Sequence, residues 1–382
     1  MRKHWFYRSC LILSGLFLTG LAGMALTGDL ENTGIPVIFF FTFLLLGMQG
    51  YRQVKGFSFT VWVLAAAVLA MFFPEQIVQI GGYETERLIV PLIQIIMFGM
   101  GTAMSLQDFA GVVRMPKGVL VGLACQFSIM PALGVLLALL MGFPPEIAAG
   151  VILIGSSPSG VSSNVMAFIS KGNIALSVTL TAFATLLAPL MTPLLMEVLA
   201  GQMVPIDFFA MMVSILKMII LPIVAGLIFN RMFRGRARWL HEFMPVVAMA
   251  ANVIIIAVIV AGGRDSLLSI GFLLLLTAIL HNGAGYFLGY WGSRLAGLNK
   301  IDSRTIAFEV GMQNGGMAAG IASEMGRTAT MGLFPAVFGT WMDISGSMLA
   351  NWWRDRQPVD PEEKVVTTVV MENVAIENEQ SE

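Results

Sequence analysis

Cysteine, histidine and charge are all scarce in this sequence. Its 382 residues include two cysteines and three histidines, and only 12% of them are charged. Both cysteines, Cys10 and Cys125, lie in apolar runs, which leaves neither a disulfide framework nor a cysteine-rich metal site. A formal net charge of −1 provides no basic face for nucleic acid. These shortages exclude a disulfide-stabilised domain, a cysteine-rich metal protein and a nucleic-acid-binding protein.

Apolar residues make up 57% of the chain, and its mean hydropathy is +0.82. Such a composition, gathered into repeated long apolar runs, is typical of an all-α polytopic membrane protein. A signal peptide is the alternative for the first run, but its Phe, Met and Leu residues favour an uncleaved helix. Twelve membrane segments are predicted near residues 10–27, 35–51, 57–73, 88–107, 117–141, 146–170, 173–199, 206–233, 242–262, 268–294, 303–323 and 327–353.

The basic residues predict the orientation of these segments. With a cytoplasmic N-terminus, eighteen of the 22 Lys and Arg residues fall on the cytoplasmic side. Arg87, Arg264 and Arg327 fall outside, and Lys217 lies within a segment. The positive-inside rule therefore places both termini in the cytoplasm of a multi-pass protein, which we expect in the inner (plasma) membrane of the cell.

The last ten segments divide into two sets of five, residues 57–200 and 201–356. The fourth segment of each set carries a glycine-rich break, and an odd number of segments gives the sets opposite topology. We therefore expect inverted five-helix repeats. Residues 1–56 would add two N-terminal transmembrane helices, with a role in packing or targeting. Residues 357–382 are polar and acidic, which predicts a disordered cytoplasmic tail.

The stretch Gly155-Ser-Ser-Pro-Ser-Gly-Val-Ser-Ser-Asn164 interrupts one apolar segment at mid-depth. Unwound backbone survives in a bilayer only where protein buries it or where it lines a wet cavity. We expect Ser162, Ser163 and Asn164 to cap the helix that resumes here, and close helix crossing is an alternative role for the serines. The N-terminus of that half-helix would favour an anion, while the carbonyl end of the preceding half-helix would favour a cation.

A second break is predicted at Glu309-Val-Gly-Met-Gln-Asn-Gly-Gly316, in the corresponding segment of the other set. Paired breaks of this kind point to the binding site of a secondary transporter. Glu309 is an ionisable residue inside a membrane segment, and such residues usually face a pathway, a partner or an ion. Gln313 and Asn314 add oxygen ligands that suit an alkali cation better than a transition metal. A protonated glutamic acid that serves packing alone is the alternative.

Further polar side chains lie within other segments. Ser177, Thr181 and Thr185 recur every four residues and therefore share one helix face, although each hydroxyl could instead bond back to the i−4 carbonyl. Gln126 needs a buried partner for its amide. For His281 we expect a helix-packing hydrogen bond rather than proton transfer.

Together these motifs resemble the bile acid:sodium symporter family. The resemblance covers residues 57 to about 353. It is carried by the first break, by Lys171-Gly-Asn-Ile-Ala-Leu-Ser177 and by Glu309-Val-Gly-Met-Gln313-Asn314. It implies ten helices in panel and core domains, with two broken helices that cross at the centre. The two extra N-terminal helices and the acidic tail depart from that ten-helix pattern, which leaves their role open.

The resemblance also implies which residues bind sodium and substrate. One sodium site would consist of Ser163, Asn164, Ser177, Thr181 and Glu309. A second would consist of Gln126, Glu309 and Gln313 with the carbonyls of Val310 and Met312. The anionic group of the substrate would face Asn314 and the backbone amides of Ser159 and Gly160.

We therefore expect a sodium-coupled symporter that imports an organic anion, bile acid-like or a small carboxylate, by alternating access. Sodium ions, the organic anion and membrane lipid would be its only partners, with no obligate protein partner and no enzymatic activity. Coupling to protons through Glu309 is one alternative. Another is an intramembrane serine hydrolase built on Ser159 and His281, although no Gly-x-Ser-x-Gly elbow surrounds these serines.

Overall fold

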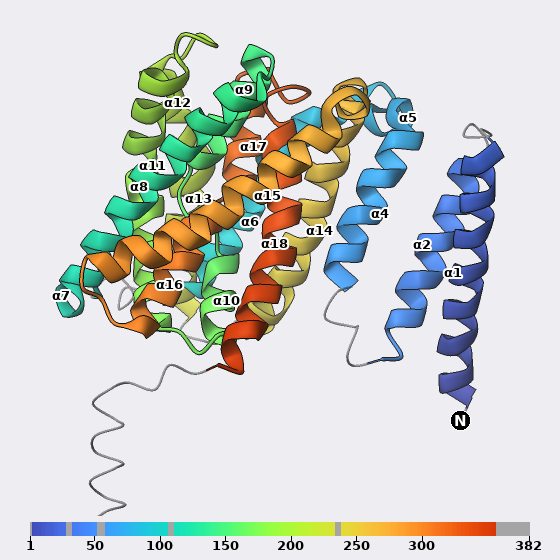
Figure 1. Cartoon of the computed structure of the whole chain (residues 1–382), viewed down its shortest axis with the longest axis horizontal. Coiled ribbons are helices and arrows are strands. Elements are labelled where there is room, and N and C mark those ends of the chain that lie inside the picture. The colour runs from blue at the N-terminus through green and yellow to red at the C-terminus, as the bar shows by residue number, and fades with distance from the viewer. Residues whose placement is uncertain (1, 28–32, 52–57, 106–110, 234–237, 357–382) are drawn as a thin grey trace, which may run out of the picture.

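The computed structural model describes the chain except for residues 1, 28–32, 52–57, 106–110, 234–237 and 357–382. The predicted C-terminal tail therefore lies outside the described residues. The described part consists of helices and one two-stranded hairpin (Figure 1). This composition confirms the prediction of an all-α polytopic protein.

Each predicted membrane segment coincides with one helix or with consecutive helical pieces. These are α1 (Arg2–Thr27), α2 (Gly34–Met48), α4 (Ser58–Phe72), η2 (Thr85–Leu88) with α6 (Ile89–Ala103), α8 (Pro116–Met141), α9 (Pro145–Gly155) with α10 (Ser162–Ile169), α11 (Ile174–Ala200), α12 (Phe208–Ile215) with η4 (Leu216–Ile220) and α13 (Leu221–Phe233), α14 (Arg238–Gly262), α15 (Arg264–Leu295), α16 (Lys300–Gly311) with α17 (Gly315–Glu324), and α18 (Leu333–Arg354). The remaining elements are α5 (Pro74–Val78), β1 (Gln79–Ile80), β2 (Tyr83–Glu84) and α7 (Gly111–Arg114).

Seven helical stretches within the described residues are long and apolar enough to cross a membrane. They belong to α1, η2 with α6, α8, α11, α12 to α13, α14 and α15. Three apolar helices, α2, α4 and α9, are shorter. The chain is therefore a multi-pass membrane protein, and the two broken segments fall short of this length because each consists of two half-helices.

Two local features differ from the sequence-based expectation. Helix α1 begins at Arg2 rather than near residue 10, because a membrane helix can continue past the apolar run into its charged flank. Between α5 and α6 the chain forms an unpredicted hairpin of β1 and β2. Its turn consists of Gly81 and Gly82, with φ of 59° and 86°, a left-handed conformation that glycine adopts without a Cβ clash.

The helices pack in two groups. In the first group, α6 contacts α13 and α14, and α14 also contacts α4. In the second group, α8, α9, α11, α15, α16 and α18 pack on one another. Helices α1 and α2 pack against each other and reach the first group through α4, at the edge of the molecule in Figure 1. The start of α1 and the end of α18 lie on the same side of the bundle (Figure 1).

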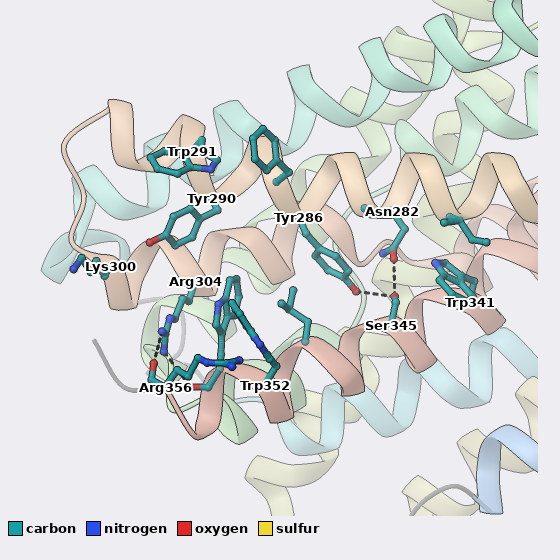
Figure 2. Close-up of a pocket in the computed structure, with 15 residues that line it drawn as sticks. Asn282, Tyr286, Tyr290, Trp291, Lys300, Arg304, Trp341, Ser345, Trp352 and Arg356 are labelled. Carbon is teal, nitrogen blue, oxygen red and sulfur yellow. Dashed lines mark hydrogen bonds between the residues drawn. The ribbon is translucent and has the colours of Figure 1, made fainter. Parts of the chain in front are cut away.

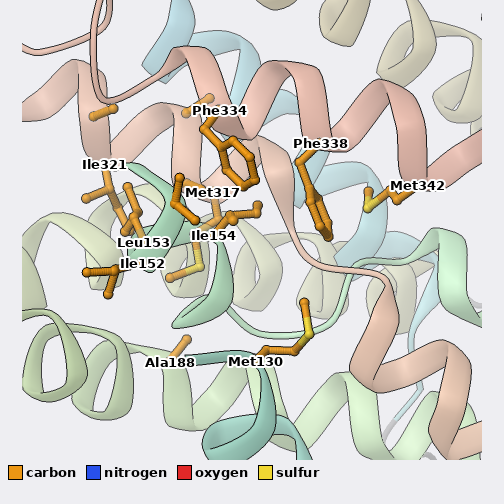
Figure 3. Packing of buried hydrophobic residues seen from close by; sticks show 14 of the residues in the cluster. Met130, Ile152, Leu153, Ile154, Ala188, Met317, Ile321, Phe334, Phe338 and Met342 are labelled. Atoms are coloured by element: carbon orange, nitrogen blue, oxygen red, sulfur yellow. The ribbon is translucent and has the colours of Figure 1, made fainter. Parts of the chain in front are cut away.

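The core surrounds the two broken segments. Ile152, Leu153 and Ile154 on α9, together with Phe334 and Phe338 on α18, are fully buried (Figure 3). Lipid tails are as apolar as these side chains, so close packing rather than escape from water holds membrane helices together. A tightly packed shell of this kind fixes the position of the polar backbone that it encloses.

Candidate functional site

The two broken segments cross and hydrogen-bond through their unwound backbone. Ser159 and Gln313 form an antiparallel bridge. The Gly160 N–H donates to the Met312 carbonyl at 3.0 Å, and the Asn314 N–H donates to the Pro158 carbonyl at 2.8 Å. A Cβ at Gly160 would lie 2.8 Å from the Gln313 carbonyl oxygen, so this approach requires glycine. The crossing thereby satisfies backbone groups that no water could reach.

Both breaks lie within their predicted stretches, and both are narrower than predicted. Helix α9 ends at Gly155 and α10 begins at Ser162. Helix α16, by contrast, continues through Gly311, and the Met312 N–H still donates to the Phe308 carbonyl at 2.9 Å. Only residues 312–314 are non-helical there. The expectation that Glu309 itself lies in unwound backbone is therefore wrong: Glu309 projects from an intact helical turn.

The helix caps also differ from the prediction. Helix α10 has no side-chain cap, because Ser163 and Asn164 direct their oxygens toward other side chains. Asn314 provides the cap at the other break, where its Oδ1 accepts from the Met317 N–H of α17 at 2.9 Å. Asn173 caps α11 in the same way, at 3.1 Å from the Leu176 nitrogen. The sequence does contain this signal, since Asn is a preferred N-cap residue.

Glu309 lies at the centre of a buried set of oxygens, which we name the carboxylate cluster: Glu309, Ser163, Asn164, Ser177 and Thr181. The hydroxyls of Ser163 and Ser177 lie 2.7 Å and 2.5 Å from Glu309 Oε1. The Thr181 hydroxyl lies 2.9 Å from Oε2. Asn164 Oδ1 lies 2.8 Å from Ser177 Oγ and 3.1 Å from Thr181 Oγ1. The structure thus brings together the five side chains expected at the first sodium site.

The carboxylate cluster has fewer protons than oxygen contacts. Ser163, Ser177 and Thr181 carry one hydroxyl proton each, yet they make seven contacts of hydrogen-bond length, one of them to the Gly160 carbonyl. The buried Ser159 hydroxyl also lies close to Glu309. A cation among these oxygens would offset their repulsion. Among the described residues no three His, Cys, Asp or Glu side chains are grouped so that they could hold a metal ion. Hydroxyl, amide and carboxylate oxygens like those of the carboxylate cluster suit an alkali cation better than a transition metal.

Gln126 and Gln313 form a second set, the amide cluster. Gln126 Nε2 donates to Gln313 Oε1 at 2.7 Å and to the Ser157 carbonyl at 2.9 Å. Gln313 Nε2 donates to the Val310 carbonyl at 2.6 Å. Within the described residues no hydrogen bond joins the amide cluster to Glu309, whose carboxylate instead contacts Ser163, Ser177 and Thr181. The Met312 carbonyl accepts from Gly160, so the members expected at the second sodium site are neighbours with separate partners.

A cavity of about 240 Å³ adjoins the crossing between the two helix groups. Gly160, Ser162, Gln313 and Asn314 line it from the crossing, and Asp343 lines it from α18. The Gly160 N–H, expected to face a substrate, donates instead to Met312. Apolar side chains of α6 and α14 form much of the remaining lining, together with the polar Asn252 of α14. The cavity therefore combines an apolar wall with a few convergent polar groups, the usual character of a small-molecule site.

Asp343 is the polar residue that the sequence analysis missed. Its Oδ1 is buried and has no hydrogen-bond partner, while the side chain of Ser162 lies close by. The available signal was an ionisable residue in the middle of the apolar segment 327–353, the same criterion that singled out Glu309.

Two other predicted polar residues have structural partners. Thr185 bonds back to the Thr181 carbonyl at 2.7 Å, as the alternative for this helix face expects. His281 Nε2 lies 3.0 Å from the Met130 carbonyl, in the helix-packing role expected for it. Among the described residues His281 makes no hydrogen bond to Ser159, so the geometry gives no support to a hydrolase built on that pair.

Comparison with known proteins agrees with this geometry. Residues 90–270 match the family described as Sodium Bile acid symporter family. YocS of Bacillus subtilis, an uncharacterized sodium-dependent transporter, is 40% identical over 299 residues, which are 78% of this chain and 91% of that protein. BASS1 of Arabidopsis thaliana, a probable chloroplastic sodium/metabolite cotransporter, is 32% identical over 301 residues, which are 79% of this chain and 74% of that protein. The resemblance inferred from the two breaks is thereby confirmed, and the chain belongs to the sodium/bile acid symporter family of membrane transporters.

Proposed function

We propose that this protein is a sodium-coupled symporter that imports an organic anion by alternating access. The observation that carries the proposal is the carboxylate cluster, where a buried acid and four polar side chains from α10, α11 and α16 converge with too few protons for their contacts. The relatives described as a sodium-dependent transporter and as a probable sodium/metabolite cotransporter support the same conclusion.

Sodium would bind among the oxygens of the carboxylate cluster and neutralise Glu309. Since Ser163 and Asn164 belong to α10 and Glu309 to α16, one ion would connect both broken helices and thereby organise the cavity beside them. Linkage then requires that bound substrate tighten sodium binding by the same factor by which sodium tightens substrate binding.

A second sodium ion is proposed at Gln126, Gln313 and Glu309 with the Val310 and Met312 carbonyls. The nearness of the two glutamines and Val310 supports this site. Its occupation requires the glutamine side chains to exchange their mutual hydrogen bond for the ion, because their oxygens now accept from each other.

The substrate is proposed to bind in the 240 Å³ cavity. Asn314 and the Ser159–Gly160 segment would contact its anionic group. Asp343 also lines this cavity and restricts which substrates can bind. Its carboxylate would repel a substrate that offered only negative charge. An organic anion that also carries a hydroxyl or ammonium donor would satisfy the unpartnered Asp343 Oδ1.

The architecture that supports transport is proposed to be an inverted repeat, with α4 to α11 related to α12 to α18. Exchange of the two halves relates the contact of α4 with α14 to that of α13 with α6. It also relates the contact of α8 with α9 to that of α15 with α16. The first helix group would be the panel and the second the core. The distribution of basic residues favours cytoplasmic termini. The plasma membrane is the proposed location.

Binding of radiolabelled sodium to the purified full-length protein tests this proposal directly. Saturable binding that a Glu309→Gln variant loses would support it, with Glu197→Gln as the matched carboxylate change at an exposed position of α11. A screen of organic anions by thermal shift, in sodium chloride and in choline chloride at fixed pH, would then identify the substrate. Substrate stabilisation that is equal in both salts would contradict sodium coupling and favour coupling to protons.

A further inference from the structure

A larger cavity, of about 720 Å³, lies between α15, α16 and α18, away from the crossing (Figure 2). We name it the aromatic groove. Its lining shares no residue with the lining of the cavity proposed for the substrate. Six of the aromatic side chains that line it are Tyr286, Tyr290, Trp291, Trp341, Trp352 and Trp353. Four of the seven tryptophans of the chain therefore gather in this one groove.

One end of the aromatic groove is cationic. Lys300, Arg304 and Arg356 lie together at this end, whereas Trp341 and Ser345 lie at the other (Figure 2). The Arg304 and Arg356 guanidiniums stack over Trp353 and Trp352, at 5.3 Å and 4.4 Å from the ring centroids. In the described part of the chain none of the three cations forms an ion pair.

Among the described residues, two acids close in sequence to the cationic end have other partners and form no ion pair with Lys300, Arg304 or Arg356. Asp302 accepts from the side chains of Asn173 and Asn299, and Asp355 pairs with Arg354. Arg304 uses two of its five N–H donors on the carbonyls of Trp353 and Arg356. Its guanidinium is thus held in place with donors to spare, which is the arrangement that favours binding of a phosphate.

The rim of the groove faces the surroundings of the helix bundle. Phe287, Trp291 and Trp352 are 60%, 50% and 52% exposed. In a multi-pass protein, large apolar side chains exposed on the outer face of membrane helices contact lipid. Trp341 and Trp353 are twelve residues apart on α18, about 18 Å at 1.5 Å per residue. That length is close to the ~15 Å of one hydrocarbon leaflet.

We propose that the aromatic groove binds one anionic phospholipid, with its phosphate at Lys300, Arg304 and Arg356 and an acyl chain along the aromatic side chains. Basic pockets between membrane helices recognise anionic head groups in this manner. A free inorganic anion would leave the apolar length of the groove unfilled, and an uncharged lipid would leave three cations without a counter-charge.

The floor of the groove connects this lipid to the transport site. Asn282 Nδ2 donates to the carbonyl of Gly311, the last residue of α16, at 2.8 Å. The Ser345 hydroxyl in turn donates to Asn282 Oδ1 at 2.6 Å, as Figure 2 shows. Both side chains line the groove. A lipid seated here would therefore press on the residues that hold the second break in place, two positions from Glu309.

Tryptophan quenching in liposomes tests the proposal. The full-length protein is reconstituted in two equimolar mixtures of phosphatidylglycerol and phosphatidylcholine. Bromine is on the acyl chains of phosphatidylglycerol in the first mixture and of phosphatidylcholine in the second. Bromine density is equal in both, so bulk lipid quenches equally. A groove selective for anionic lipid gives stronger quenching in the first mixture.

A double variant, Lys300→Gln with Arg356→Gln, should lose this difference, because it removes the two cations whose side chains are solvent-exposed while it keeps Arg304 in place. Arg231→Gln, a cation on α13, is the matched control and should retain it. Equal quenching of the parent protein in both mixtures would overturn the proposal, leaving an ordinary aromatic belt. A difference that persists in the double variant would overturn it too. Sodium binding does not enter this readout, so its outcome is independent of the proposed transport function.

Discussion

The carboxylate cluster and the amide cluster both adjoin the crossing of the broken segments, but they differ in charge and in hydrogen-bond balance. The amide cluster is neutral, and Gln126 and Gln313 supply donors as well as acceptors. The carboxylate cluster contains a buried acid and more close oxygen contacts than hydroxyl protons. A balanced cluster is satisfied without an ion, whereas the unbalanced one is the better candidate for a cation. Sodium dependence should therefore rest chiefly on the carboxylate cluster.

Loss of the Glu309 charge should have the largest effect on sodium binding, because it removes the charge that distinguishes the carboxylate cluster from the amide cluster. Glu309→Gln removes the charge proposed to hold the ion, and an interaction with a charged group is worth roughly 3 kcal/mol, or more than about 100-fold in affinity. We expect saturable binding of radiolabelled sodium to disappear. Glu197→Gln should bind sodium like the parent. Normal binding by Glu309→Gln would remove the carboxylate from the ion site.

Truncation of Gln126 should separate the two clusters. Gln126→Ala leaves Gln313 Oε1 and the Ser157 carbonyl without their donor, which should cost about 2 kcal/mol of stability. The unfolding temperature should fall, and the sodium titration should change from cooperative to single-site while sodium still binds. Gln94→Ala, which removes an amide bonded to the Lys217 carbonyl, is the control. A titration that stays cooperative would place no sodium at the amide cluster.

The charge of Asp343 should affect substrate binding rather than sodium binding. Asp343→Asn replaces an unpartnered acceptor by a neutral amide, so substrates with a hydroxyl or ammonium donor should bind about 10-fold more weakly, for a loss of roughly 1.5 kcal/mol. Thermal shift with pairs of carboxylates that differ by one donor group measures this effect. Asp265→Asn, at an exposed position of α15, should change nothing. Equal losses for both members of each pair would contradict a donor-selective role.

The smallest effect is expected for Asn164. Its amide oxygen contacts the Ser177 and Thr181 hydroxyls but not the carboxylate itself, so Asn164→Ala removes a neutral ligand worth about 1 kcal/mol. The half-saturating sodium concentration should rise about 5-fold. Asn230→Ala, which removes a bond to the Met104 carbonyl, is the control. An unchanged sodium requirement would exclude Asn164 from the site.

Some of these features could be predicted from the sequence, for identifiable reasons. The helices and both breaks follow from apolar run length and from glycine, proline and serine inside a run. The four-residue spacing places Ser177 and Thr181 on one helix face, whereas their convergence with Glu309 was expected only from the resemblance to the symporter family. The separate partners of Glu309 and Gln126 could not, because they depend on which way each side chain turns at a helix crossing.

Other features depend on geometry that no local pattern encodes. The extent of α16 through Gly311 follows from regular hydrogen bonding that glycine permits but does not require. The aromatic groove unites α15, α16 and α18, and the sequence shows only scattered Trp, Tyr and basic residues there. Asp343 was visible in the sequence, but nothing in its neighbourhood indicated that it faces the same cavity as Asn314.

Reciprocal backbone hydrogen bonds, between Gly160 and Met312 and between Pro158 and Asn314, join the two broken segments rigidly at the centre of the molecule. Segments joined in this way should move as one unit. The change between the two access states of the proposed cycle should therefore occur where the chain passes from one helix group to the other. The short turns at Gly201 and at Gly262–Gly263 are two such places. Spin labels on α9 and α17 should therefore keep their separation throughout the cycle, while labels on α9 and α14 should not.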